Sequence, residues 1–197
     1  AGLRYGRSEA RETEPVKPVD DQHVDAVLPF VTPHVAAMIQ VQRLTGMRPD
    51  DMVSMRPCDI DQSGDVWIYE RRDHKNRWRG HRRLVPLGPK AQAVLKPFMD
   101  RAPEAYLFSP KESEAWRLEH RPAYFKKERK TKINPCELRA REKAKQDRKR
   151  RKSKRPRRDR YDTDSYRNAI EYGFAKAKKA GVEIPHWHPN QLRHTRP

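Results

Sequence analysis

The stretch "TPHVAAMIQVQRLTGMRPDDMVSM", residues 32–55, carries clear helix punctuation. Thr32 is a favourable cap, Pro33 suits a first helical turn, and Gly46 is suited to end the helix. Side chains at helical spacing would form a stripe that faces a core, and they are Val35, Met38, Ile39 and Gln42. The stretch therefore predicts one core helix between Thr32 and Gly46.

A second, shorter helix is predicted to begin near Pro49. Asp50 and Asp51 would then lie in its first turn, where the helix dipole favours anions. This arrangement places Arg48 at the corner between the two helices.

Downstream, three segments predict strands: "CDID" (58–61), "DVWIYE" (65–70) and "RRLVPL" (82–87). Ser63-Gly64 is a turn signal, and the second segment is rich in residues that favour strands. We expect an antiparallel sheet of three strands with a basic hairpin tip around residues 75–81.

The later helices are predicted from apolar spacing. "GPKAQAVLKPFMD" (88–100) reads as a short helix, and "AYLFSP" (105–110) as a brief buried run. A helix should follow a cap at Asp162 or Thr163 and end by Gly181. The fold class is therefore α+β, mainly helical with a small three-stranded antiparallel sheet.

Charge is concentrated in one segment. Residues 126–160 hold 19 Lys and Arg against 5 Asp and Glu, so +14 of the net +18 lies there. Residues 111–161 are polar and are expected to be a mobile insertion, parts of which could become helical on DNA. The positive electrostatic field of this segment favours binding to a polyanion such as nucleic acid. That the segment is only a solvated tether without a specific partner stays an open interpretation.

Three motifs occur in a fixed order: "TGMRPDD" (45–51), "HKNRWRGHRRLVPLG" (74–88) and "NQLRHT" (190–195). In this order they resemble the catalytic domain of the tyrosine recombinase, or phage integrase, family. That family has a TGxRxxE/D corner, a hairpin lysine before an xVPL strand, and an HxLRHT helix. The resemblance covers roughly Pro29 to Thr195, with the basic segment as an insertion.

The resemblance implies that DNA is cleaved without metal or ATP by a tyrosine that becomes joined to the 3′-phosphate. Arg48 and Arg193 would clamp the phosphate, because guanidinium forks match its oxygens. Lys75 would protonate the leaving 5′-oxygen, and His194 would hydrogen-bond the phosphate or its arginine neighbours. Asp51 would orient Arg48. Basic residues expected to contact DNA are Arg77, Arg79, Lys149, Arg150, Arg151 and Lys152.

Two departures from the family pattern matter. Asn190 stands where the family has histidine, and whether His188 takes over that role is left open. The family's nucleophilic tyrosine falls some tens of residues after "LRHT", whereas Tyr161, Tyr166 and Tyr172 all precede Arg193. We therefore expect residues 22–197 to be a partial catalytic domain, incomplete at the C-terminus and without cleavage activity alone. Residues 1–21 would be a linker or remnant.

Other expectations concern partners and alternatives. Double-stranded DNA is the expected partner, on which copies of the chain could self-associate. No membrane partner, metal or small-molecule cofactor is expected, since no apolar run is long enough and the histidine spacing H-x-H-x5-H fits no usual zinc pattern. Cys58 and Cys136 suggest no disulfide framework, and a cytoplasmic, nucleoid-associated location is expected.

One alternative is a non-enzymatic basic nucleic-acid-binding module. Another is a metal-dependent nuclease, although turns and caps account for its candidate carboxylates, Asp50, Asp51, Asp59 and Asp61.

Overall fold

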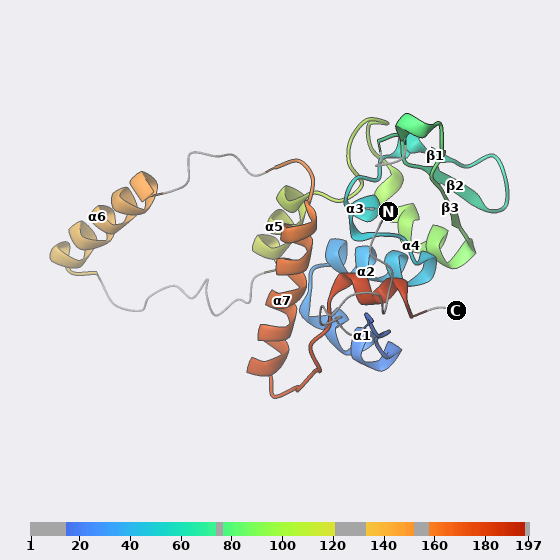
Figure 1. The fold of residues 1–197 in the computed structure, drawn as a ribbon. Coiled ribbons are helices and arrows are strands. Elements are labelled where there is room, and N and C mark those ends of the chain that lie inside the picture. The colour runs from blue at the N-terminus through green and yellow to red at the C-terminus, as the bar shows by residue number, and fades with distance from the viewer. Residues whose placement is uncertain (1–14, 74–76, 121–132, 152–157, 196–197) are drawn as a thin grey trace, which may run out of the picture.

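The computed structural model describes residues 15–73, 77–120, 133–151 and 158–195 (Figure 1). The predicted fold class is confirmed: the described chain is mainly helical, with one antiparallel sheet of three strands. None of the helices in these ranges has the length and apolar character needed to cross a bilayer.

The central helix is α2 (Pro33–Thr45), which contacts α3, α4, α5, α7 and η5. Gly46 ends it in the predicted left-handed conformation, at φ 65°, and the Gly46 N–H donates to the Gln42 carbonyl at 2.8 Å. Thr32 occupies the N-cap position, but its hydroxyl donates to Ser113 of α5 at 3.4 Å instead of capping the helix. The buried residues of α2 are Val35, Ala37, Met38, Ile39, Val41 and Gln42.

The sheet has the predicted order β1 (Ile60–Asp61), β2 (Trp67–Glu70) and β3 (Leu84–Leu87). Tyr69 lies at its centre, opposite Ile60 on one side and Val85 on the other. The Tyr69 side chain is buried, and its hydroxyl donates to the Asp51 carbonyl at 3.1 Å. The sheet is therefore packed directly against the short helix that follows Arg48. Two short 3₁₀ helices flank the strands, η2 (Pro57–Asp59) and η3 (Arg77–Arg79).

Helix α4 (Pro89–Met99) packs on α2 and β3 through Ala91 and Leu95. The run after it is buried as predicted, because Leu107 and Phe108 are both almost fully enclosed. The Leu107 N–H donates to the Met55 carbonyl at 2.9 Å, which joins this run to the end of the corner region.

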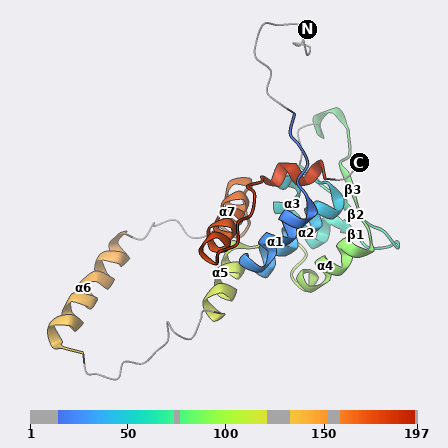
Figure 2. The same cartoon turned by 90° about the horizontal axis from the view of Figure 1, so that it is seen from below.

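Helix α5 (Pro110–Glu119) lies inside the segment expected to be an insertion, yet it contacts α2. Its buried contact is polar: Ser113 is enclosed, and Glu112 accepts from Arg101 at 3.2 Å. Helix α6 (Pro135–Arg151) stands apart from the other elements in both views (Figures 1 and 2).

Helix α7 (Thr163–Lys179) begins at Asp162, whose Oδ1 accepts from the Ser165 N–H at 2.7 Å. It packs against α1 (Asp21–Val27) and η1 (Leu28–Phe30). Gly173 permits this approach, because a Cβ there would lie 2.6 Å from Val31 Cγ1.

The chain then returns over α2 as η5 (Pro189–Arg193), a 3₁₀ helix that begins at Pro189 (Figure 2). Buried Leu192 and Trp187 anchor this last described segment in the core.

Candidate phosphate-binding site

Arg48 lies at the corner between α2 and α3 (Pro49–Val53), as predicted. It is extended, at φ −70° and ψ 149°, and its backbone N–H donates to Asp51 Oδ2 at 3.2 Å. This bond closes the first turn of α3. The Arg48 side chain is exposed, and no described residue hydrogen-bonds its guanidinium, so the charge is accessible to a ligand.

Gln42 joins this corner to η5. It is fully buried, and its side-chain amide donates to the Pro189 carbonyl at 2.8 Å and the Met47 carbonyl at 3.3 Å. Its oxygen accepts from the Tyr166 hydroxyl at 3.0 Å. The bond to Pro189 spans 147 residues of sequence. Gln42 therefore ties α2, α7 and η5 together at one point, and a buried amide with all these partners is strongly favoured over one without them.

Beside this tie lies a pocket of about 760 Å³, here named the corner pocket. Three residues proposed from the sequence line it together: Arg48, His188 and Asn190. Its other polar side chains were not predicted and come from the N-terminal segment, α3, α7 and η5: Lys17, Asp50, Thr163, Asp164, Arg167 and Gln191. Arg167 is paired with Asp164 at 3.1 Å, so the exposed Arg48 guanidinium is the better placed cation for an anionic ligand.

Arg193 approaches the same corner from the other side. Its carbonyl oxygen lies 3.7 Å from the position that a Cβ on Gly46 would occupy. Its Nε is buried and has no hydrogen-bond partner among the described residues. His194 is exposed at the end of η5, where its N–H donates to the Gln191 carbonyl at 3.0 Å. Neither Arg193 nor His194 is among the residues that line the corner pocket.

Asp51 anchors the hairpin. Its carboxylate is 1 % exposed and accepts hydrogen bonds from Arg71 Nη1 and from Arg83 Nε, each at 2.9 Å. Arg71 directly follows β2 and Arg83 directly precedes β3, and the Arg71 N–H donates to the Arg83 carbonyl at 3.1 Å. Asp51 thus holds the backbone of Arg48 and the guanidinium groups of two hairpin arginines. Arg83 lies inside the quoted hairpin motif and Arg71 does not, but the sequence assigned neither a role, since that role depends on where the sheet packs.

Lys75, at the hairpin tip, lies outside the described residues. Arg77 and Arg79 belong to η3, and the Arg79 guanidinium lies 4.5 Å from the ring centre of exposed Trp78. Three of the remaining basic positions, Lys149, Arg150 and Arg151, are the last residues of α6, whereas Lys152 lies outside the described ranges.

The other aspartates of the corner region have structural partners. Asp59 is 7 % exposed, accepts a hydrogen bond from Arg56 Nε at 2.8 Å and forms an ion pair with Arg72 Nε at 2.8 Å. Asp61 accepts from the Ser63 N–H at 3.0 Å in the predicted turn. Hydrogen bonding from Ser63 lowers the pKa of Asp61. Ion pairs and turns therefore account for these carboxylates, as the sequence suggested.

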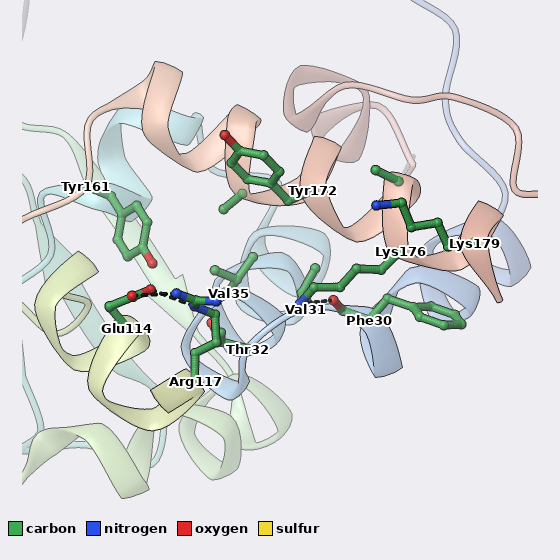
Figure 3. Close-up of a pocket in the computed structure, with 12 residues that line it drawn as sticks. Phe30, Val31, Thr32, Val35, Glu114, Arg117, Tyr161, Tyr172, Lys176 and Lys179 are labelled. Carbon is green, nitrogen blue, oxygen red and sulfur yellow. Dashed lines mark hydrogen bonds and ion pairs between the residues drawn. The ribbon is translucent and has the colours of Figure 1, made fainter. Parts of the chain in front are cut away.

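The tyrosines near α7 lie elsewhere. Tyr161 and Tyr172 line a second pocket of about 490 Å³ between α5, α7 and η1, which shares no residue with the corner pocket (Figure 3). Tyr166 is fully buried, as expected for a core residue. Burial raises the pKa of both Tyr161 and Tyr166, which disfavours the phenolate form.

A family model described as the phage integrase family matches residues 20–196. Comparisons with curated proteins and with solved structures gave no significant match. The matched range includes both the Arg48 corner and the η5 motif, which are the two elements that Gln42 joins. The chain therefore belongs to the phage integrase family, whose members are site-specific recombinases that act on DNA.

Proposed function

We propose that this chain forms the phosphate-binding part of a recombinase active site, which cleaves and rejoins DNA strands through a phosphotyrosine. One observation carries the proposal: Arg48 and Asn190 line one pocket although they belong to motifs at opposite ends of the folded chain. A free guanidinium beside an amide and an imidazole offers charged and neutral donors to the non-bridging oxygens of a phosphate.

Arg193 completes the clamp in this proposal. Its buried Nε has no partner among the described residues, and an unsatisfied buried donor typically costs about 1–3 kcal/mol. Arg193 does not line the corner pocket, so its side chain would have to turn toward the phosphate for Nε to donate this hydrogen bond. Two arginines would then share the negative charge that builds on phosphorus, each contributing roughly 2–4 kcal/mol of transition-state stabilisation.

The chemical step is a transesterification. A tyrosine oxygen attacks phosphorus and releases its proton to solvent, the bond between phosphorus and the 5′-oxygen breaks, and the Lys75 ammonium donates a proton to that oxygen. Rejoining reverses each transfer, with a 5′-hydroxyl as the attacking group. We assign His194 and Asn190 as hydrogen-bond donors to the phosphate, with His188 at the pocket wall. The anchoring of Arg71 and Arg83 on Asp51 supports a role for the hairpin, because it ties the strands that flank Lys75 to the Arg48 corner.

The nucleophile is not provided by the tyrosines near α7, because Tyr166 is buried and Tyr161 and Tyr172 line the separate pocket. The 197-residue polypeptide is thus expected to bind DNA without cutting it. Incubation with a labelled suicide substrate should give no protein–DNA adduct, and a covalent adduct would refute this part of the proposal.

Basic residues of α6 and the hairpin would add sequence-independent affinity by releasing counterions from DNA. Such a protein acts where DNA lies, at the nucleoid, and several copies could assemble on one target.

Binding measurements test the site itself. A duplex selected by this chain from random DNA is compared with an unrelated duplex of equal length. Arg48→Ala and Arg193→Ala should each weaken binding to the selected duplex about ten-fold or more, since a charge-assisted bond is worth roughly 1.5–3 kcal/mol.

Arg117→Ala is the matched control, because Arg117 is a half-exposed arginine of the second pocket, paired with Glu114. It removes the same charge, and it should change the affinities for the selected and the unrelated duplex by equally small amounts. Equal losses on both duplexes for Arg48→Ala and Arg193→Ala would instead favour a non-enzymatic binding module.

A further inference from the structure

Glu171 of α7 lies beside His186 and His188 of the segment that leads into η5. One ligand atom from each residue falls within 4.8 Å of the other two. His186 Nε2 and Glu171 Oε1 are 2.6 Å apart. The His186 and His188 rings meet edge to face with their centres 4.6 Å apart. Two imidazoles and a carboxylate thus converge outside the three motifs at residues 45–51, 74–88 and 190–195.

The alternation of an extended chain brings the two imidazoles together. His188 is extended, at φ −113° and ψ 149°, and successive side chains of an extended segment point to opposite sides. Trp187, between the two histidines, is 1 % exposed and packs edge-on against Phe174. Because Trp187 points inward, both neighbouring histidines project outward, over the turn of α7 that carries Glu171.

The core holds this arrangement in place. Phe174 contacts the His186 ring at 5.2 Å between centres as well as the Trp187 ring at 5.6 Å. Trp187 Nε1 also donates to the His23 carbonyl at 3.4 Å. The three ligand residues are therefore carried by one helix and by one extended segment whose backbone is anchored in the core.

We propose that Glu171, His186 and His188 bind a divalent transition-metal ion, for which Zn²⁺ is the best match. Two imidazoles and one carboxylate form a donor set that zinc commonly uses, with water in the fourth position. Metal–ligand distances of about 2.0–2.2 Å place tetrahedral ligand atoms roughly 3.3 Å apart. One present separation is 2.6 Å and none exceeds 4.8 Å, so modest rotations of the exposed side chains would form the site.

A metal site was not expected from the sequence, because the spacing of the histidines fits no usual zinc pattern. The fold supplies the carboxylate, because α7 runs back beneath the segment that contains both histidines. His188 also lines the corner pocket. A metal at this position would pin the start of η5 to α7, next to Asn190, and so order one wall of that pocket. The proposed metal binding by Glu171, His186 and His188 does not depend on the proposed recombinase function.

Metal binding is tested directly on the full 197-residue chain, prepared without a polyhistidine tag and freed of metal. Zn²⁺ is titrated in competition with a chromophoric chelator. One site per chain is expected, and Glu171→Gln, His186→Ala and His188→Ala should each weaken it about ten-fold or more. His120→Ala is the matched control, because exposed His120 stacks on Trp116 away from the cluster, and it should leave the affinity unchanged.

Free thiols could also bind zinc, at Cys58 and Cys136. Co²⁺ separates the two cases, because thiolate ligands give an intense near-ultraviolet charge-transfer band that imidazole and carboxylate ligands lack. The expected spectrum has visible d–d bands only. A thiolate band, or zinc affinity that is equal in the wild type and the three ligand variants, overturns the proposal. Far-ultraviolet circular dichroism of each variant confirms that the exposed substitutions leave the fold intact.

Discussion

Asp51 Oδ2 accepts a hydrogen bond from Arg83 Nε at 2.9 Å and forms an ion pair with Nη2 of the same guanidinium at 2.6 Å. The same carboxylate accepts from Arg71 and from the backbone of Arg48. One buried acid therefore fixes a helix start and both strands of the hairpin. The Asp51 carboxylate therefore links the corner to the hairpin.

Asp51→Asn is expected to lower the free energy of unfolding by about 3–5 kcal/mol, because two partly buried guanidinium groups lose their counter-charge. Urea denaturation measures the loss. Asp50→Asn is the control, since Asp50 is half-exposed and shares only Arg71, and it should cost less than about 1 kcal/mol. Similar losses for both variants would show that Asp51 is not the anchor.

Gln42→Leu is expected to cost about 2 kcal/mol or more, because the carbonyl of Pro189 and the hydroxyl of Tyr166 lose their buried partner. Tyr166→Phe alone should cost about 1 kcal/mol. In the Gln42→Leu background, the Tyr166→Phe change should cost little, since the shared bond is already broken. A double-mutant cycle measured by urea denaturation checks this, and strictly additive losses would contradict the proposed tie.

Gly173→Ala should destabilise the fold although alanine favours helix by about 1 kcal/mol. The new Cβ would lie 2.6 Å from Val31 Cγ1, and a valine side chain yields little, so overpacking of about 1–3 kcal/mol dominates. Adding Val31→Ala removes the clashing methyl group and should make Gly173→Ala neutral or stabilising in that background. Thermal unfolding of the wild type, the two single variants and the double variant tests this. A Gly173→Ala change that is equally destabilising in both backgrounds would contradict the prediction.

Stability should fall in mild acid because of His34. Burial lowers the pKa of His34 from 6.5, although nearby Glu112 partly opposes that shift. The unfolded chain therefore binds a proton near pH 6.5 that the folded chain resists, so the contribution is present above that pH and is lost as the pH falls below it. Urea denaturation between pH 7.5 and about 5.5 should show a steeper decline for the wild type than for His34→Gln. Parallel pH profiles would rule out this contribution.

Salt dependence should report on the basic end of α6. Replacement of Lys149, Arg150, Arg151 and Lys152 by glutamine should reduce the slope of log affinity against log salt by up to about 3.6 for duplex DNA. The pair Lys90→Gln and Lys96→Gln on α4 is the control, with a much smaller change per charge. An unchanged slope in the α6 variant would mean that these residues do not contact DNA.

Local chemistry made much of the fold predictable. The left-handed turn at Gly46, the Asp162 cap and the strand around Tyr69 each follow from one or two residues and their neighbours. Within the site, the position of Arg48 at a helix corner was predictable for the same reason, as was the opening of η5 at Pro189.

Other features depend on tertiary packing, which local patterns do not specify. Helix α5 was missed because its buried contacts are polar, through Ser113 and Glu112, so it has no apolar stripe to detect. Likewise, the pairing of Arg83 with Asp51 and of Glu171 with His186 joins residues whose spacing has no local signature.

After the basic segment, the chain returns to the body beside the first turn of α5, just before α7 begins. Lys111 and Asp159 form an ion pair there, and Tyr161 lies against Glu114 in the second pocket (Figure 3). The end of α5 is only about one helix length away from Asp159, so a connection much shorter than residues 120–158 would also join α5 to α7. The connection between α5 and α7 can consequently vary in length while the packing of both helices on α2 stays as it is.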